Sequence, residues 1–355
     1  MRNFLHRVLV IICLFFVLGL VLGYVSVYVN PNTSSIPALF GLAYPYLLFI
    51  NFIFLFYWIY RKRWTFLLPL FVIIAGWTTF SNYFAIGGSS SDVITQEVKV
   101  MSYNVRYFNR YNWNKDPETA NKILEMVKSE NVDVVCFQEF LLGNNNKISI
   151  TSIKDKLVNY PYSHISKDKT LAIFSRYKLT NRNNISFDNS KSARAIYADV
   201  KMGRESIRIF NVHLESNRFN RKDYEFIKKL GTSPEEQDID AAKGITKRLK
   251  YAFKKRANQA QLLSEIISTS QRKSILCLDM NDTPVSYAYR TSRGDMNDSF
   301  LEKGSGIGTT YVGDFPSYRI DYVFHHKDIE CVSYRISRVK YSDHYPLIVG
   351  FRKDF

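Results

Sequence analysis

Three long stretches without a charged residue mark the first quarter of the chain. They cover residues 8–29, 38–60 and 64–86. A helix needs about 20 mostly apolar residues to cross a bilayer, so each stretch is long enough. The pattern therefore predicts three transmembrane helices, within a membrane anchor and short linker formed by residues 1–96.

Two other interpretations compete with three full spans. The first stretch resembles the apolar region of a cleaved signal peptide, but it is longer than the roughly 7–15 residues typical of such a region. Asn51, a polar residue inside the second stretch, is compatible with a re-entrant segment that does not cross the bilayer. Both remain alternatives to the three-span prediction.

Positive charges around the stretches predict the orientation of the anchor. Arg2 and Arg7 precede the first stretch, and an Arg-Lys-Arg triplet at 61–63 separates the second from the third. The segments 30–37 and 87–96 contain neither Lys nor Arg. Cytoplasmic loops carry the excess of Lys and Arg, so we expect an integral membrane protein with a cytoplasmic N-terminus. Residues 97–355 would then lie on the periplasmic or extracellular side.

The pattern changes after the anchor, where short apolar runs alternate with amphipathic segments. Runs typical of strands cover 98–103, 132–137, 171–174, 195–200, 207–214, 275–278, 320–324 and 346–351. The segment 201–205 between two of these runs indicates a hairpin turn. Asp116, followed by Pro117, is a typical helix start. Hairpins join some strands and helices join others, which predicts one α/β domain with mixed sheets over 97–355.

Composition narrows the class of protein. The chain is 46% hydrophobic, which excludes an intrinsically disordered chain. Its four cysteines are too few for a disulfide scaffold, and none of them shows metal-ligand spacing. The net charge of +16 attracts nucleic acid and anionic membrane alike, so charge alone does not separate these two partners.

Polar side chains lie at the ends of the predicted strands: four motifs follow a strand, Asp321 lies near the start of one, and the last motif precedes the final strand. The motifs are Met101-Ser-Tyr-Asn104, Gln138-Glu139, Asn211-Val-His213, Leu278-Asp279-Met280-Asn281, Arg319-Ile-Asp321 and Ser342-Asp343-His344. Such groups are costly to bury unless they have partners or a function. Crevices at strand ends are the usual ligand sites of α/β sheets. Carboxylate and amide oxygens suit Mg²⁺ or Mn²⁺ better than Zn²⁺.

In this order the six motifs resemble those of the endonuclease/exonuclease/phosphatase superfamily, also called DNase I-like. The resemblance covers essentially all of 97–355 and implies a four-layer α/β sandwich of two packed mixed β-sheets. It also implies a hydrolase that acts on phosphoric ester bonds and depends on a divalent metal, Mg²⁺ or Mn²⁺. Each motif is weak alone, and the ordered set carries the resemblance.

The resemblance implies a metal site and a water site. Glu139 is similar to the main metal ligand of the family. Asn104 and Asp343 resemble the residues that help to hold the metal. Asp279 resembles the aspartate that positions or deprotonates the attacking water. Asn281 is similar to the residue that hydrogen-bonds the phosphate.

The resemblance also implies a group of catalytic histidines. His344 is similar to the histidine that touches the scissile phosphate, and Asp321 to the carboxylate that orients it and keeps it protonated. His213 resembles a second histidine found in the DNase I-like and sphingomyelinase-like branches. Asn211, in the same motif, is expected to contact substrate. The sequence does not identify an acidic partner for His213.

One motif departs from the family pattern. The usual Gly-Asp-Phe-Asn is replaced by Leu278-Asp279-Met280-Asn281. Both functional positions are kept, so we expect activity to be kept as well.

A long insert at 216–274 separates His213 from Asp279. It predicts a helix with apolar residues on one face. The opposite face carries Lys247, Arg248, Lys250, Lys254, Lys255 and Arg256. This face is either solvated or a contact surface for nucleic-acid phosphates or anionic lipid headgroups.

The sequence predicts a membrane-anchored phosphoesterase that hydrolyses phosphodiesters through water positioned by Asp279. Its expected partners are a phosphate-ester substrate and the lipid bilayer. Three activities remain open: a nuclease on DNA or RNA, a sphingomyelinase-like lipid phosphodiesterase, and a phosphomonoesterase. A catalytically silent anchored binding module is the alternative from another class. No protein partner is inferred.

Overall fold

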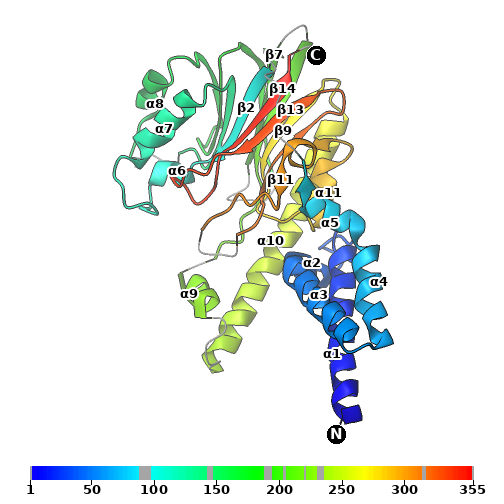
Figure 1. Ribbon diagram of the computed structural model, residues 1–355. Coiled ribbons are helices and arrows are strands. Elements are labelled where there is room, and N and C mark those ends of the chain that lie inside the picture. Colours follow the sequence, from blue (N-terminus) through cyan, green and yellow to red (C-terminus); the bar gives the residue numbers. More distant parts are fainter. Residues whose placement is uncertain are drawn as a thin grey trace.

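The computed structural model places two six-stranded sheets face to face, with a helical anchor at one end (Figure 1). It describes residues 2–87, 97–141, 147–187, 194–202, 205–219, 221–229, 236–313 and 317–353. The predicted α/β fold with two mixed sheets is confirmed. The predicted domain boundary after residue 96 and the centre of the predicted hairpin turn at 203–204 lie outside the described residues.

The first sheet has the strand order β13-β14-β2-β3-β5-β4. Its strands are β2 (Glu97–Asn104), β3 (Val134–Gln138), β4 (Tyr162–Ile165), β5 (Leu171–Ser175), β13 (Cys331–Ile336) and β14 (Leu347–Arg352). The pair β2–β3 is parallel and the other neighbours are antiparallel. Parallel strands end at the same edge of a sheet, so Asn104 and Glu139 emerge close to one another.

The second sheet has the order β10-β12-β9-β8-β7-β6. Its strands are β6 (Leu179–Ile185), β7 (Arg194–Met202), β8 (Glu205–His213), β9 (Ser274–Asp279), β10 (Asn297–Asp298) and β12 (Asp321–His325). Here β8 and β9 are the parallel pair. His213 and Asp279 therefore end at one edge, as Asn104 and Glu139 do in the first sheet.

Alternation along the strands builds three apolar layers. In β2, Val98 and Val100 point into the core between the sheets, and Met101 and Tyr103 point outward. The outward residues pack beneath α7 (Thr119–Ser129) and α8 (Ile150–Lys156). The outer face of the second sheet is covered by α10 (Glu236–Ser268) and α11 (Tyr287–Arg293). This alternation follows from the two-residue period of a strand.

The anchor contains one continuous helix of membrane-spanning length. In α1 (Arg2–Val25), residues 4–25 are long and apolar enough to cross a bilayer. The remaining anchor elements are α2 (Ile36–Leu42), α3 (Tyr44–Tyr60), the short 3₁₀ turn η1 (Trp64–Phe66), α4 (Leu67–Ala75) and α5 (Trp77–Tyr83). The prediction of three continuous helices is therefore wrong for the second and third stretches. The count reaches three only if each bent pair is one span.

One bend lies at a proline and the other at a glycine. The chain turns by 71° between α2 and α3, where Pro45 lies in the first turn of α3. Its missing N–H and its ring prevent α2 from continuing. The chain turns by 57° between residues 64–75 and α5, at Gly76. A Cβ at Gly76 would lie 2.1 Å from the Tyr24 ring, so glycine allows this bend to approach α1.

The anchor is docked on the sheet domain by specific contacts. β1 (Ala85–Ile86), at the end of the anchor, pairs with β11 (Ser305–Gly306). Ser26 Oγ donates to the carbonyl of Val285 at 3.0 Å, and Val285 packs into the apolar core of the anchor. The sheet domain and the anchor are thus joined by hydrogen bonds as well as by the polypeptide chain.

The insert folds into α9 (Arg221–Lys229) and α10. Its helix is confirmed, and at 33 residues α10 is about 50 Å long. Lys247, Lys250 and Lys254 are exposed as expected. Arg256 is only 1% exposed, because its guanidinium is buried in an ion pair with Asp282. The expectation that Arg256 belongs to the solvated basic face is wrong.

Candidate active site

Three neighbouring strands align three of the predicted catalytic residues. The register of β8, β9 and β12 places His213 opposite Asp279, and Asp279 opposite Asp321. Residues opposite one another on adjacent strands share a face, so the three side chains form a row at the strand ends. Each is at most 3% exposed. Burial shifts the pKa of two of them, lowering that of His213 and raising that of Asp279.

His344, just before β14, joins this row from the first sheet. Its Nδ1 lies 2.9 Å from Oδ2 of Asp321, and its Nε2 lies 4.0 Å from Asp279. Burial favours the neutral imidazole, but the carboxylates of Asp321, Asp279 and Glu139 outweigh it and raise the pKa of His344 to about 9. The imidazole is therefore charged near neutral pH and donates its Nδ1–H to Asp321.

Asp279 is held by hydrogen bonds at both oxygens. Asn104 Nδ2 donates to Oδ2 at 2.8 Å, and the backbone N–H of Asn281 donates to Oδ1 at 3.1 Å. Burial raises the pKa of Asp279 to about 7, although the charge of His344 opposes this shift. A carboxyl group with a pKa near neutrality is well matched to accepting a proton from water.

His213 faces two acidic groups that sequence reasoning did not identify as its neighbours. Its Nε2 lies 3.6 Å from Oδ2 of Asp279 and 3.9 Å from Oε1 of Glu139. Burial lowers the pKa of His213, so its imidazole is neutral near pH 7. Its Nε2 is buried and makes no hydrogen bond among the described residues. Such an orphaned nitrogen beside two carboxylates marks a position for water or another ligand.

Glu139 comes from the opposite sheet and lines the cleft. It follows β3 with a φ of +46°, a conformation that is rare for a residue with a side chain. Its backbone carbonyl accepts a hydrogen bond from the N–H of Tyr107 at 2.6 Å. Backbone strain of this kind gathers at functional sites, where the surroundings hold it in place.

A left-handed turn lies beside Glu139. All four residues of α6 (Arg106–Asn109) have positive φ, between 46° and 61°. Without glycine this costs about 1–2 kcal/mol per residue. The turn brings the guanidinium of Arg106 into an ion pair with Asp343, at the edge of the cleft.

The two predicted asparagines of the substrate site have different positions. Asn281 lines the cleft. Asn211 lies between the sheets, where its Nδ2 donates to the carbonyls of Phe137 and Ala172 at 2.9 and 3.0 Å. Its Oδ1 accepts from Gln138 at 2.7 Å. Asn211 therefore ties β8 to β3 and β5 behind the site, and it does not line the cleft.

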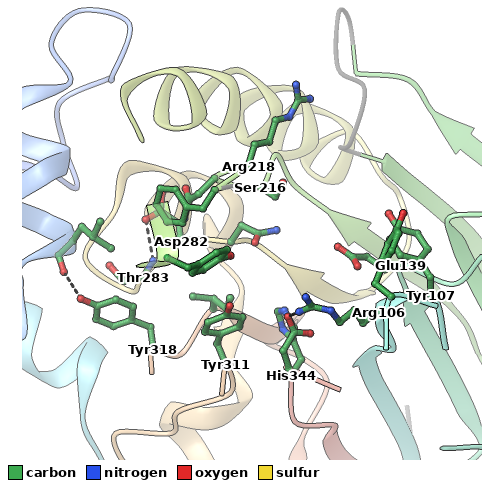
Figure 2. Close-up of a pocket in the computed structure, with 18 residues that line it drawn as sticks. Arg106, Tyr107, Glu139, Ser216, Arg218, Asp282, Thr283, Tyr311, Tyr318 and His344 are labelled. Atoms are coloured by element: carbon green, nitrogen blue, oxygen red, sulfur yellow. Dashed lines mark hydrogen bonds and ion pairs between the residues drawn. The ribbon is translucent and has the colours of Figure 1, made fainter. Parts of the chain in front are cut away.

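The cleft in front of this row has a volume of about 300 Å³. Figure 2 shows Glu139, Arg106 and Tyr107 on one side, His344 and Tyr311 along the base, and Asp282 and Thr283 toward the other side. The ring of Tyr311 meets His344 edge to face, with centroids 5.3 Å apart. Sequence reasoning missed Arg106, Tyr107 and Tyr311, because none of them belongs to a motif that ends a strand.

The donor groups fit a divalent metal. Glu139 and Asp343 present carboxylates at the cleft, and Asp279 and the orphaned Nε2 of His213 lie behind them. Ligand atoms of Asp279, Asp321 and His344 lie within 4.8 Å of one another. Asn104 is less suited, since its Nδ2 donates to Asp279 and its Oδ1 accepts from the N–H of Arg106 at 3.0 Å.

The sequence of this domain matches a known family. Residues 101–344 match the Endonuclease/Exonuclease/phosphatase family. The chain belongs to this family. Members of the family are hydrolases of phosphoric esters and generally depend on a divalent metal, and the acidic and histidine groups at the cleft agree with that dependence. The family match covers every strand-end motif from Met101 to His344.

Solved structures share the fold of this family domain. Humanized D. rerio TDP2 is 17% identical over 72% of this chain and 99% of its own, with a TM-score of 0.53. An endonuclease/exonuclease/phosphatase from Bacteroides vulgatus is 17% identical over 73% of this chain and 100% of its own, with a TM-score of 0.51. The catalytic domain of human Nocturnin, solved with bound sulfate, is 18% identical over 72% and 94%, with a TM-score of 0.50.

The anchor has a separate match. Residues 6–83 match a family described as Domain of unknown function (DUF8431). No curated protein matches the chain.

Proposed function

We propose that this family member is a membrane-anchored phosphodiesterase that uses a divalent metal, Mg²⁺ or Mn²⁺, and a water positioned by Asp279. The observation that carries the proposal is the meeting of the His344–Asp321 pair, Asp279 and His213 at one cleft that Glu139 borders. The residues come from both sheets, so only the folded domain assembles them.

Glu139 and Asp343 would hold the metal, which neutralises charge developing on the phosphate. Asp279 orients the water and accepts its proton. His344, protonated and held by Asp321, donates a hydrogen bond or a proton to the phosphate oxygens. Asn281 hydrogen-bonds the phosphate. Asn104 positions Asp279 through the 2.8 Å hydrogen bond between them.

The arginines near the cleft favour a diester over a monoester. Arg106 pairs with Asp343, Arg218 with Glu215, and Arg256 with Asp282. A phosphomonoester carries up to two negative charges and a diester carries one. Because each of these cations already faces a carboxylate, the cleft suits the less charged ester.

The anchor would place the domain outside the cytoplasm. α1 is long and apolar enough to cross a bilayer, and the bent pairs α2–α3 and α4–α5 would form the other two membrane segments. The basic residues Arg2, Arg7 and 61–63 support a cytoplasmic N-terminus.

Hydrolysis of bis(p-nitrophenyl) phosphate by the full chain in detergent tests the proposal. We expect hydrolysis with Mg²⁺ or Mn²⁺, none with EDTA, and a faster rate than with p-nitrophenyl phosphate. Asp279→Ala should abolish it, and Asp155→Ala, which changes an exposed carboxylate on α8, should not. A folded, metal-binding protein without diesterase activity would instead be the silent binding module.

A further inference from the structure

The anchor forms part of the wall of the cleft. Leu42, the last residue of α2, lines the cleft together with residues of the sheet domain. The hydroxyl of Tyr318 donates to the carbonyl of Leu42 at 3.2 Å (Figure 2). This hydrogen bond joins the anchor to the sheet domain at the wall of the cleft. A segment predicted from its hydrophobicity to lie in the membrane thus borders a phosphoesterase site.

Apolar side chains line the cleft on the side of the anchor, beside the polar groups of Asp282 and Thr283 (Figure 2). Phe219 lines the cleft next to Leu42 and belongs to a cluster formed by α2, α9 and α10, here called the α2–α10 cluster. Its members are Ala38, Leu39, Leu42, Phe219, Phe226, Ile227, Ile245, Leu249 and Phe253. Glu139, Asp343 and His344 lie at the other end of the cleft. An amphiphilic molecule would match this division.

The position of α2 would bring the anchor side of the cleft close to a bilayer that the anchor enters. α2 bends by 71° away from α3, and in Figure 1 it lies at the end of the anchor that meets the sheets. α10 passes beside α2, and its lysines Lys243, Lys247 and Lys250 are exposed there. Lysines beside a membrane segment attract anionic lipid headgroups.

We propose that the substrate is a phospholipid held in the bilayer. This inference rests on the proposed function and names the substrate of that site. The lipid phosphate would lie at Glu139 and His344, and the acyl chains would pass over Leu42 and the α2–α10 cluster. The water oxygen bonds to phosphorus, one P–O ester bond breaks, and the leaving oxygen takes a proton and departs as an alcohol. No reactant other than water is needed.

The same features disfavour nucleic acid. A nucleic-acid groove neutralises several phosphates along its length. Here Arg106, Arg218 and Arg256 each face a carboxylate.

The test uses the full chain in vesicles of phosphatidylethanolamine and phosphatidylglycerol. Lipid products are measured by mass spectrometry, with bis(p-nitrophenyl) phosphate hydrolysis and plasmid nicking in parallel. We expect metal-dependent lipid hydrolysis that Asp279→Ala abolishes. Leu42→Glu and Phe219→Ala should each lower the ratio of lipid to bis(p-nitrophenyl) phosphate turnover about tenfold, as loss of an apolar pocket contact does. Val158→Glu, an exposed apolar residue outside the cleft, should leave both rates unchanged.

Two results would overturn the inference and leave the proposed function standing. One is hydrolysis of bis(p-nitrophenyl) phosphate without any lipid product, with or without plasmid nicking. The other is an unchanged ratio in both cleft variants, each shown to be folded by its thermal unfolding. Absence of all three activities would instead reject the proposed function, and the inference with it.

Discussion

At the scale of single residues, the catalytic role proposed for His344 depends most directly on Asp321. Asp321 accepts the Nδ1–H of His344 at 2.9 Å and helps to keep the imidazole charged against the effect of burial. In Asp321→Asn the neutral amide no longer offsets the effect of burial on the pKa of His344, so less of the imidazole is protonated. We expect a loss of kcat of about 10²–10⁴-fold, the usual size of an acid–base contribution. KM should change less than kcat, because the contact of Asn281 with the phosphate remains. The control is Asp328→Asn, which alters an exposed carboxylate beside His326.

Asp199 makes the stability of the fold depend on pH. Its carboxylate is buried and accepts from Arg208 at 2.7 Å and from Asn181 at 2.7 Å, and Arg272 lies 2.9 Å away. Burial alone would raise its pKa, but these partners outweigh burial and lower the pKa below its usual 3.8. A lowered folded-state pKa gives stability that is present above the unfolded pKa and is lost as the pH falls through the folded pKa.

Asp199→Asn should therefore lower the free energy of unfolding near neutral pH by about 2 kcal/mol, the usual worth of hydrogen bonds to a charged group. The difference from the unchanged protein should shrink below the ordinary carboxyl pKa. Denaturant unfolding in detergent at several pH values measures both effects. Asp240→Asn, at an exposed pair with Lys243, should show neither. A pH-independent difference would contradict the argument.

The strand-end residues could be placed from the sequence, and their surroundings could not. Asp279 ends a strand, Asp321 begins one and His344 precedes one, and the apolar runs of these strands are plain. Their meeting at one edge is therefore predictable. The left-handed turn at 106–109 contains no glycine and gives no sequence signal. The acidic neighbours of His213 come from two different sheets. Their distances depend on how those sheets pack, which local pattern does not encode.

At the scale of elements, the close packing of α2 against the loop that follows β9 can be tested at Gly41. A Cβ there would lie 2.3 Å from the carbonyl of Val285 and 2.4 Å from Oγ of Ser26. The nearest atom is backbone, so α2 or the loop carrying Asp279 and Val285 must shift. We expect Gly41→Ala to lower the melting temperature and the rate of diester hydrolysis together.

Gly244→Ala is the matched control, since it is also a glycine within a helix. A Cβ at Gly244 meets only the end of Arg248, at 3.9 Å. Alanine there should stabilise α10 by about 0.8–1.0 kcal/mol through helix propensity. Equal destabilisation by both variants would show that the packing of α2 is not responsible.

The elements of the anchor show that the length of an apolar stretch does not by itself predict a continuous helix. The stretches 38–60 and 64–86 satisfy the length needed to cross a bilayer, yet each is broken. Pro45 and Gly76 were visible in the sequence, but proline and glycine are tolerated in membrane helices. What decides the bends is tertiary contact: α2 packs on α10, and Gly76 packs on Tyr24.

At the scale of the whole molecule, the anchor supports both loops that carry the catalytic groups. Val285, four residues after Asn281, is inserted into the anchor core. Arg319, two residues before Asp321, donates to the backbone carbonyl of Asn82 at 2.8 Å and to Asp298 at 2.7 Å. The two loops are thus fixed by the same helices that the sequence predicts to lie in the membrane.

Removal of the anchor should therefore affect the site as well as the location. A fragment of residues 97–355 loses the partners of Val285, Arg319 and β11, and it uncovers the apolar residues of α10 that pack on α2. We expect it to melt at a lower temperature than the full chain and to hydrolyse bis(p-nitrophenyl) phosphate more slowly, although this substrate needs no membrane. If the fragment matched the full chain in both respects, the anchor would serve only to tether, and the contacts at Val285 and Arg319 would have no role in catalysis.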